Sequence, residues 1–358
     1  MAENGLRFDA GEWTGALGDS VTVLPIVVGL AALTPVSLAH ALLCFGLFQV
    51  AWGLAYGLPL SVEPMKALAG LALAGTLTAG EYIAAGLLAG VVLVAAAATG
   101  ALSRLRRHIG EPTIRGVQLA VALLLVRAGV DLGVANPMLA LSAAGVAAVV
   151  ALTGRRRGAA LAVLAVGLAL AAAEAGVPAA EPPALAAFPA GAPAFTAEAL
   201  SATAAQLAMT VGNAAVATSL LLSDLFDAEV SADRLSASMG AMCLAAVPLG
   251  GIPMCHGSGG LAGKHAFGAR TGGANLVLGG LYLAAVPFAS VVAAFPMAVL
   301  GVLLVVVAVH LGRRAVDVEG RGALALVVTV GAVGLAWNVG AAFLLGVVGD
   351  AVRRRLTA

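Results

Sequence analysis

The segment Pro253-Met-Cys-His-Gly-Ser-Gly-Gly-Leu-Ala-Gly263 interrupts an apolar stretch of the chain with a proline and a series of glycines. A related segment, Leu58-Pro59-Leu60-Ser61, lies earlier in the chain and is followed by Pro64. Proline cannot donate a backbone hydrogen bond, and it disfavours helical backbone at the residue before it. The sequence therefore predicts, at 63–74 and at 256–266, an extended stretch that leads into a helix of half the usual length.

The composition indicates that lipid, rather than water, surrounds most of this 358-residue chain. Hydrophobic residues make up 61% and charged residues 10%, whereas soluble domains are about half apolar and about a quarter charged. Nucleic-acid binding is excluded, because 19 Lys and Arg are balanced by 18 Asp and Glu and no basic region stands apart. We expect an all-α polytopic membrane protein embedded in the lipid bilayer.

Apolar runs separated by polar breaks predict fourteen membrane-spanning segments, seven in each half of the chain. In the first half the expected ranges are 15–34, 38–56, 63–74, 82–101, 114–132, 137–153 and 159–175. In the second half they are 199–223, 236–248, 256–266, 274–293, 297–311, 322–335 and 339–350. The third and tenth segments are predicted to be discontinuous helices.

The distribution of charge supports this count of spans. With the N-terminus in the cytoplasm, the inward connections collect the basic residues at 104, 106, 107, 115, 155–157, 234, 264, 270, 313, 314, 321 and 353–355. Cytoplasmic loops carry such an excess of Lys and Arg. We therefore expect a multi-pass protein of the cell membrane with both termini cytoplasmic.

An internal repeat relates the two halves of the chain. Gly18-Asp19-Ser20 and Gly212-Asn213-Ala214 have the same offset as 58–61 and 252–255. Because each half has an odd number of spans, the second copy must be inverted in the membrane, as in many secondary transporters. The predicted division is a first repeat at 1–176, an outward linker rich in Pro and Ala at 177–196, and a second repeat at 197–358.

Two discontinuous helices in inverted repeats predict a binding site. Non-helical backbone at membrane depth is tolerated only where it is buried in protein or lines a cavity. Each helix N-terminus carries roughly half a positive charge and free N–H groups. We expect both half-helices to present such groups to an anion near the midplane, although simple proline and glycine kinks are an alternative.

Further motifs accompany the 253–263 segment. They are Gly15-Ala-Leu-Gly-Asp19, Pro59-Leu-Ser-Val-Glu-Pro-Met-Lys66, Arg115-Gly-Val-Gln118, Val211-Gly-Asn213, Asp224-Leu-Phe226 and Phe267-Gly-Ala-Arg-Thr-Gly272. Over nearly the whole chain these motifs resemble the molybdate transporters of the sulfate-permease superfamily. The resemblance implies two inverted seven-helix repeats, arranged as a core domain that holds the half-helices and a gate domain. It also implies uptake of a tetrahedral oxyanion, with molybdate ahead of sulfate.

Polar and ionisable side chains near the half-helices are the candidate site residues, because charges inside a membrane are costly and mark function. The candidates for substrate binding are Ser61, Val62, Glu63, Lys66, Asn213, Cys255, His256, Gly257 and Ser258. The candidates for proton coupling are Asp19, Glu63 and Asp224.

Several of these residues also have a purely structural interpretation. Glu63 and Lys66 are three residues apart and can simply neutralise each other. His256 titrates near neutral pH, but a backbone partner can satisfy it as well as an anion or a proton. Gln206, like other lone amides in membrane helices, is expected to bond a neighbouring helix. Lys264 is explained by the excess of basic residues on the inner side.

The sequence thus predicts a secondary active importer of a tetrahedral oxyanion, with molybdate as the first candidate, coupled to protons and working by alternating access. A sulfate or nucleobase permease of the same fold and an anion channel are the alternatives. No zinc, nucleotide or catalytic-triad pattern occurs in the sequence, so we expect no enzyme activity, no metal and no cofactor. The oligomeric state stays open, with a homodimer among the options.

Overall fold

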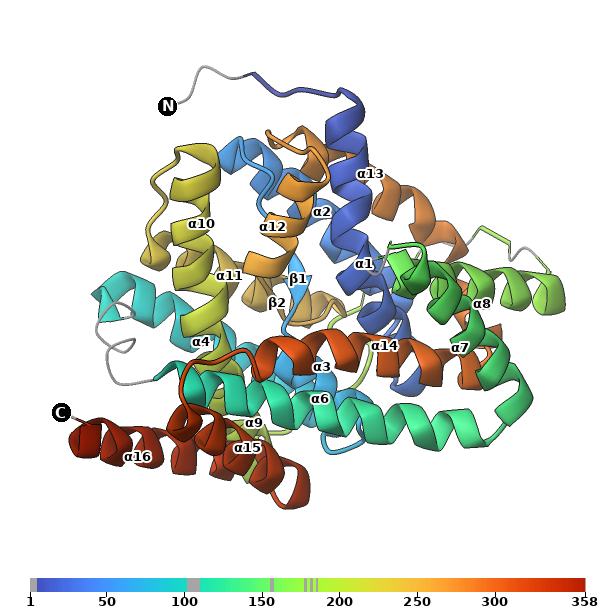
Figure 1. The fold of residues 1–358 in the computed structure, drawn as a ribbon. Coiled ribbons are helices and arrows are strands. Elements are labelled where there is room, and N and C mark those ends of the chain that lie inside the picture. Colours follow the sequence, from blue (N-terminus) through green and yellow to red (C-terminus); the bar gives the residue numbers. More distant parts are fainter. Residues whose placement is uncertain are drawn as a thin grey trace.

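The structure is a computed structural model that describes residues 5–101, 110–154, 158–176, 179–180, 183–184 and 186–357, without the side chains of residues 21, 22, 213, 356 and 357. The described chain is almost entirely helical (Figure 1). Its first half contains α1 (Ala10–Leu33), α2 (Leu38–Tyr56), β1 (Glu63–Pro64), α3 (Lys66–Leu73), α4 (Ala79–Thr99), α6 (Glu111–Val134), α7 (Pro137–Leu152) and α8 (Ala159–Ala175).

The second half follows the same plan. It contains α9 (Ala197–Met209), η3 (Thr210–Val216), α10 (Ala217–Phe226), α11 (Ala232–Ala246), η4 (Val247–Leu249), β2 (Met254–Cys255), α12 (Ser258–Ala266), α13 (Gly273–Ala285), η5 (Val286–Ala294), α14 (Met297–Ala315), α15 (Arg321–Ala336) and α16 (Val339–Thr357). The span at 197–226 joins α9, η3 and α10, and the span at 273–294 joins α13 and η5. The described residues therefore form 14 helical spans, as predicted.

Length and composition support a membrane location for these helices. Seven of the described helices are long and apolar enough to cross a membrane, and three shorter ones, α7, α8 and α15, are also apolar. The helices α3 and α12 have only 8 and 9 residues. They are the two discontinuous segments that the prolines and glycines predict.

The last helix is longer than predicted. Instead of ending near Asp350, α16 continues to Thr357. Asp350 pairs with Arg353 at 2.8 Å and with Arg354 at 2.5 Å, and pairs at these spacings stabilise a helix.

The basic residues predicted at 104, 106, 107 and 155–157 lie outside the described residues. The division at 176 and 197 stays a prediction.

The pairing of helices has an internal two-fold symmetry. Helix α2 packs against α13, and α4 packs against α11. In the repeat, α2 corresponds to α11 and α4 corresponds to α13. Exchanging the two halves therefore turns the α2–α13 pair into the α11–α4 pair. The same operation relates the pair α1–α12 to the pair α9–α3, and it leaves α6–α14 unchanged. This pattern is the one that an inverted repeat produces.

The same contacts divide the helices into a core and a gate. Helices α1–α4 and α9–α13 pack mainly with each other, as do α6–α8 and α14–α16. In Figure 1 the gate helices α6, α14, α15 and α16 lie below the core helices α1, α2 and α10–α13. The two short strands lie between these layers, so the half-helices begin close to the boundary between core and gate.

Glycine lets the paired helices approach closely. On α6 a Cβ at Gly129 would lie 2.5 Å from the carbonyl oxygen of Gly301 on α14. On α2 a Cβ at Gly46 would lie 3.0 Å from the carbonyl oxygen of Gly279 on α13. Helices in lipid gain no hydrophobic stabilisation by associating, so their association depends on close van der Waals packing. Small residues of this kind allow the two backbones to approach closely enough for it.

Candidate functional site

The two extended stretches meet as a short antiparallel ladder at the centre of the molecule. Glu63 lies opposite Cys255, and Pro64 lies opposite Met254. The N–H of Met65 donates to the carbonyl of Pro253 at 2.9 Å. Helix α3 follows the first strand and α12 follows the second, so the two helix N-termini begin on either side of one small ladder (Figure 1).

The N-terminus of α12 is open. Its N-cap residue, Gly257, provides no side-chain cap, and the first intrahelical bond runs from the N–H of Leu261 to the carbonyl of Gly257 at 3.0 Å. The N–H groups at 258–260 are therefore the ones that intrahelical bonding leaves over. The carboxylate of Glu63 lies against this turn, because a Cβ added to Gly257 or Gly260 would overlap it. The space beside the free N–H groups is therefore occupied by a carboxylate of the protein itself.

The N-terminus of α3 is closed, contrary to the expectation of two open ends. The side-chain oxygen of Gln206 on α9 accepts from the N–H groups of Ala67 at 2.9 Å and Leu68 at 3.3 Å. The side-chain nitrogen of Gln206 donates to the hydroxyl of Thr210 at 3.0 Å. Because this neutral amide supplies the oxygen, α3 is capped without an external anion. The expected bond from Gln206 to a neighbouring helix is confirmed.

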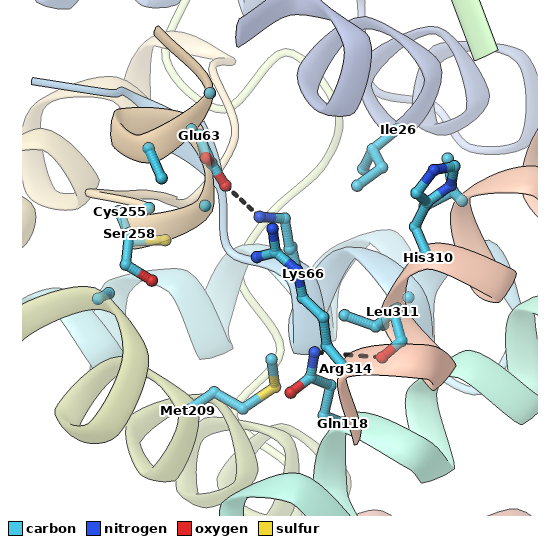
Figure 2. Close-up of a pocket in the computed structure, with 18 of the residues that line it drawn as sticks. Ile26, Glu63, Lys66, Gln118, Met209, Cys255, Ser258, His310, Leu311 and Arg314 are labelled. Atoms are coloured by element: carbon cyan, nitrogen blue, oxygen red, sulfur yellow. Dashed lines mark hydrogen bonds and ion pairs between the residues drawn. The ribbon is translucent and has the colours of Figure 1, made fainter. Parts of the chain in front are cut away.

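A cavity of about 460 Å³ lies beside the ladder, between core and gate. Of the predicted binding residues, Glu63, Lys66, Cys255, Gly257 and Ser258 line it. Figure 2 shows Lys66 forming an ion pair with Glu63 at one end of this cavity. The pairing expected from their spacing therefore exists, although Glu63 belongs to the strand rather than to the helix.

The gate contributes polar residues that were not among the candidate site residues. Helix α14 brings His310 and Arg314 to the cavity, and α6 brings Arg115 and Gln118. The guanidinium of Arg314 interacts electrostatically with both Glu63 and Lys66. The available signal was the spacing of His310 and Arg314, which places them on one face of a helix. The charge pattern had instead explained Arg314 as a cytoplasmic loop residue.

A buried polar network holds the other side of the ladder. Lys264 on α12 pairs with Asp19 on α1 at 3.2 Å, and both side chains are 0% exposed. The ammonium of Lys264 also donates to Asn275 at 2.8 Å and to Gln49 at 3.2 Å. The interpretation of Lys264 as a residue of the inner surface is therefore wrong. Several acceptors inside the core compensate its buried charge.

Ser61 links this network to the cavity. Its hydroxyl lies 2.7 Å from a carboxylate oxygen of Asp19 and 3.2 Å from one of Glu63. Neither Ser61 nor the buried Val62 lines the cavity. Asp19, a predicted coupling residue, is one hydroxyl away from Glu63 but is paired with Lys264.

His256 is satisfied within the core. One ring nitrogen lies 2.9 Å from the carbonyl of Ser61, and the other lies 2.7 Å from the hydroxyl of Ser238. The residue is 0% exposed and does not line the cavity. Because both ring nitrogens are engaged, the geometry favours a structural role that fixes the two extended stretches to each other.

Two predicted site residues, Asp224 and Asn213, are not placed in this cavity. Asp224 lines a separate surface hollow together with Arg7 and Arg270, so the structure does not bring it to the half-helices. The backbone of Asn213 lies in the π-helical turn η3, at the repeat position of Asp19. Its side chain is outside the described residues.

Two solved structures with a similar fold are described as transporters. The chain is similar to the transmembrane domain of the cyanobacterial bicarbonate transporter BicA, with a TM-score of 0.69, 15% identity, and coverage of 95% of this chain and 96% of that one. It is also similar to a murine anion transporter of solute carrier family 26 in its inward-facing state, with a TM-score of 0.74, 11% identity, and coverage of 99% and 69%. At these identities the likeness establishes the fold.

Sequence comparison establishes the family. The profile described as "Molybdate transporter of MFS superfamily" matches residues 11–125 and 198–311, one block in each half. Molybdate transporter 2 of Arabidopsis thaliana is 29% identical, over 87% of this chain and 80% of that protein. Molybdate transporter 1 of the same plant is 28% identical, over 95% and 87%. The chain is a membrane transporter rather than an enzyme, and it belongs to the molybdate transporter family.

Proposed function

We propose that this protein imports molybdate, as a secondary active transporter that works by alternating access and is coupled to protons. The observation that carries the proposal is the open N-terminus of α12, which faces a cavity that also contains Lys66 and Arg314. Helix N-termini bind anions, and discontinuous helices supply such ends in transporters. The relatives named molybdate transporters support the choice of anion.

The donors around the cavity suit a small tetrahedral dianion. The N–H groups at 258–260 and the hydroxyl of Ser258 are small hydrogen-bond donors on the first turn of α12. Lys66 adds a full positive charge nearby. A charged acceptor makes such hydrogen bonds about twice as strong as neutral ones. A nucleobase offers no comparable charge, so the geometry favours an oxyanion.

The cavity's place between core and gate supports alternating access. Movement of one rigid group against the other would expose a fixed site first to one side and then to the other. Arg115, near the start of α6, and Arg314, in the last turn of α14 beside Arg313, line the cavity at one end. By the positive-inside rule, we propose that this end faces the cytoplasm, with both termini cytoplasmic in the cell membrane.

Glu63 is the proposed coupling residue. It borders the cavity, whereas Asp19 is paired with Lys264 and Asp224 lies elsewhere. Two anions in one site disfavour each other, so an incoming dianion favours a protonated Glu63. A proton would then enter together with the substrate.

A thermal-shift experiment on the purified protein tests the substrate. Molybdate and tungstate are expected to raise the unfolding midpoint more than sulfate does. A ligand at one hundred times its Kd adds about 2.7 kcal/mol of stability. A shift with uracil and none with any oxyanion would overturn the assignment.

Uptake into proteoliposomes tests the coupling. Molybdate uptake should rise with an inward proton gradient, and Glu63→Gln should remove that dependence while leaving binding in place. The matched variant Asp19→Asn should affect folding more than coupling, because it breaks a buried pair. Molybdate uptake that changes neither with pH nor on addition of an uncoupler would rule out proton symport.

A further inference from the structure

We propose that Arg314, on gate helix α14, is a direct ligand of the oxyanion bound at the N-terminus of core helix α12. The bound anion then bridges core and gate. This inference rests on the proposed function, because it concerns the same cavity. It adds a specificity-determining residue that the sequence pattern had explained as part of a cytoplasmic loop.

The first observation is the reach of the side chain. Arg314 lies in the last turn of α14, and its guanidinium extends across the cavity to α12. A Cβ added to Gly259 would lie 2.6 Å from one terminal nitrogen of Arg314 and 3.6 Å from the other. Glu63 contacts the same turn at Gly257 and Gly260. In Figure 2 the side chains of Lys66 and Arg314 converge on the space below Glu63.

The second observation is that this guanidinium has no fixed partner. In the part of the chain that the structure describes, it makes no hydrogen bond and no ion pair within 4.0 Å. The neighbouring Arg115 differs, because it pairs with Glu111 at 3.2 Å and donates to the main-chain carbonyl of Arg314 at 2.9 Å. Asp317 also lines the cavity but forms no such pair with Arg314. Arg115 therefore holds the main chain of Arg314 in place, while the guanidinium of Arg314 is available to bind a ligand.

The third observation is the local charge. A cation directed at a helix N-terminus is unfavourable, because that end carries roughly half a positive charge. Here Lys66, Arg314 and the end of α12 all lie around the carboxylate of Glu63. The other carboxylate that lines the cavity, Asp317, forms no ion pair with Arg314 among the described residues. Asp19 does not offset this excess, because Lys264 neutralises it. A dianion at 258–260 would balance the charge and give Arg314 its missing partner.

The chemistry of the group fits this role. A guanidinium presents a planar fork of donors that binds two oxygens of a tetrahedral anion, whereas an ammonium acts as a point charge. Because α14 belongs to the gate and α12 to the core, the contact depends on how the two groups are arranged. Arg314 should therefore strengthen binding in this arrangement and release the anion when the core moves away.

Titration of the purified full-length protein with molybdate at fixed ionic strength tests the inference. Arg314→Gln is expected to weaken binding roughly tenfold to a hundredfold, the range for hydrogen bonds to charged groups. The matched control is Arg313→Gln, which removes the adjacent arginine; both arginines are exposed, but only Arg314 lines the cavity. Arg313→Gln should change affinity less than about twofold, because an exposed charge outside the cavity interacts weakly with an anion inside it. Arg314→Lys should fall between the two.

The outcomes separate this inference from the proposed function. If the wild type binds molybdate and Arg314→Gln binds as well as Arg313→Gln, Arg314 is not a ligand and the proposed function stands. If the wild type binds no oxyanion, the proposed function itself fails. Should Arg314→Gln not fold, the comparison of Arg314→Lys with Arg313→Lys decides in the same way, with equal affinities overturning the inference.

A second variant tests the contact directly. Gly259→Ala adds a methyl group against the flexible end of Arg314 and should displace it. The variant is expected to lose several-fold in affinity in the wild-type background and little in the Arg314→Gln background, since coupled residues are not additive. Equal losses in both backgrounds would show that the methyl group acts without Arg314.

Discussion

The two half-helix N-termini differ although the repeat relates them. At α3 the side chain of Gln206 accepts from two N–H groups, at 2.9 Å and 3.3 Å. At α12, among the described side chains, none accepts from the free N–H groups of the first turn, and the carboxylate of Glu63 lies against that turn. At the offset that relates 18–20 to 212–214, the residue that matches Gln206 is Glu12. Its carboxylate accepts from the N–H of Thr271 at 2.9 Å and of Ala274 at 3.1 Å, at the start of α13.

This difference favours one candidate anion site rather than two. A symmetric backbone supplies two candidate ends, and side chains then close one of them. Gln206 closes α3, while its counterpart caps α13 and leaves α12 open. The predictions below test this asymmetry.

The largest expected effect concerns the buried pair that supports α12. Lys264→Met removes the ammonium that pairs with the buried carboxylate of Asp19, which should cost about 3–5 kcal/mol of unfolding free energy. The double variant Asp19→Asn with Lys264→Met should recover part of this loss, because it buries no unpaired charge. Chemical denaturation of the three proteins measures the effect. A single variant as stable as the double variant would contradict the role assigned to the pair.

The next effect concerns the open end itself. In Gly257→Val the added side chain overlaps the space beside α12 where Glu63 now lies and where an anion would bind. Molybdate affinity should fall about a hundredfold or more, equivalent to about 2.7 kcal/mol. Gly280→Val on α13 is the control, since a Cβ there has no neighbour within 4 Å. Normal molybdate binding by a folded Gly257→Val protein would show that α12 is not the binding site.

The closed end should respond in the opposite way. Gln206→Met leaves the N–H groups of Ala67 and Leu68 without their acceptor and should cost about 1–3 kcal/mol of stability. Gln206 also lines the cavity, but its amide is bonded to α3 and to Thr210. Molybdate affinity should therefore stay within about threefold if the anion binds at α12 as proposed. Melting curves and titration of the same sample measure both quantities. An affinity loss as large as that of Gly257→Val would mean that α3 also binds the anion.

The smallest expected effect concerns a single hydroxyl. Ser258→Ala removes one donor from the open turn and should cost about 1 kcal/mol, or about fivefold in affinity. Ser142→Ala is the control, because among the described residues that exposed hydroxyl on α7 bonds only to the carbonyl of Met138 in its own helix. If both variants bind alike, the backbone N–H groups and the cations hold the anion without Ser258.

The sequence was sufficient for the architecture. The spans follow from apolar runs, and the two discontinuous helices follow from Pro59, Pro64, Pro253 and the glycines after it. Both signals are local, because they depend on backbone geometry and on the solvent that each stretch requires. The repeat then implied the inverted arrangement that the helix pairing confirms.

The candidate site was predictable only in part. The sequence motifs located Glu63, Lys66, Cys255, Gly257 and Ser258, which line the cavity. They did not show that the ring of His256 is fully bonded within the core. Nor did they show which helix end is open. The cap on α3 comes from the side chain of Gln206, which lies 139 residues after Ala67 in the sequence.

The sequence by itself therefore determined where the backbone must break, and it predicted that a helix end would be left to bind an anion. The tertiary structure alone decided which end stays open, that Lys264 is buried against Asp19, and that Arg314 reaches across from the gate. The physical reason is that helix breaks depend on local sterics, whereas amide, ammonium and guanidinium groups sit at the ends of flexible side chains. Such groups bond to whichever partner the packed helices bring within reach.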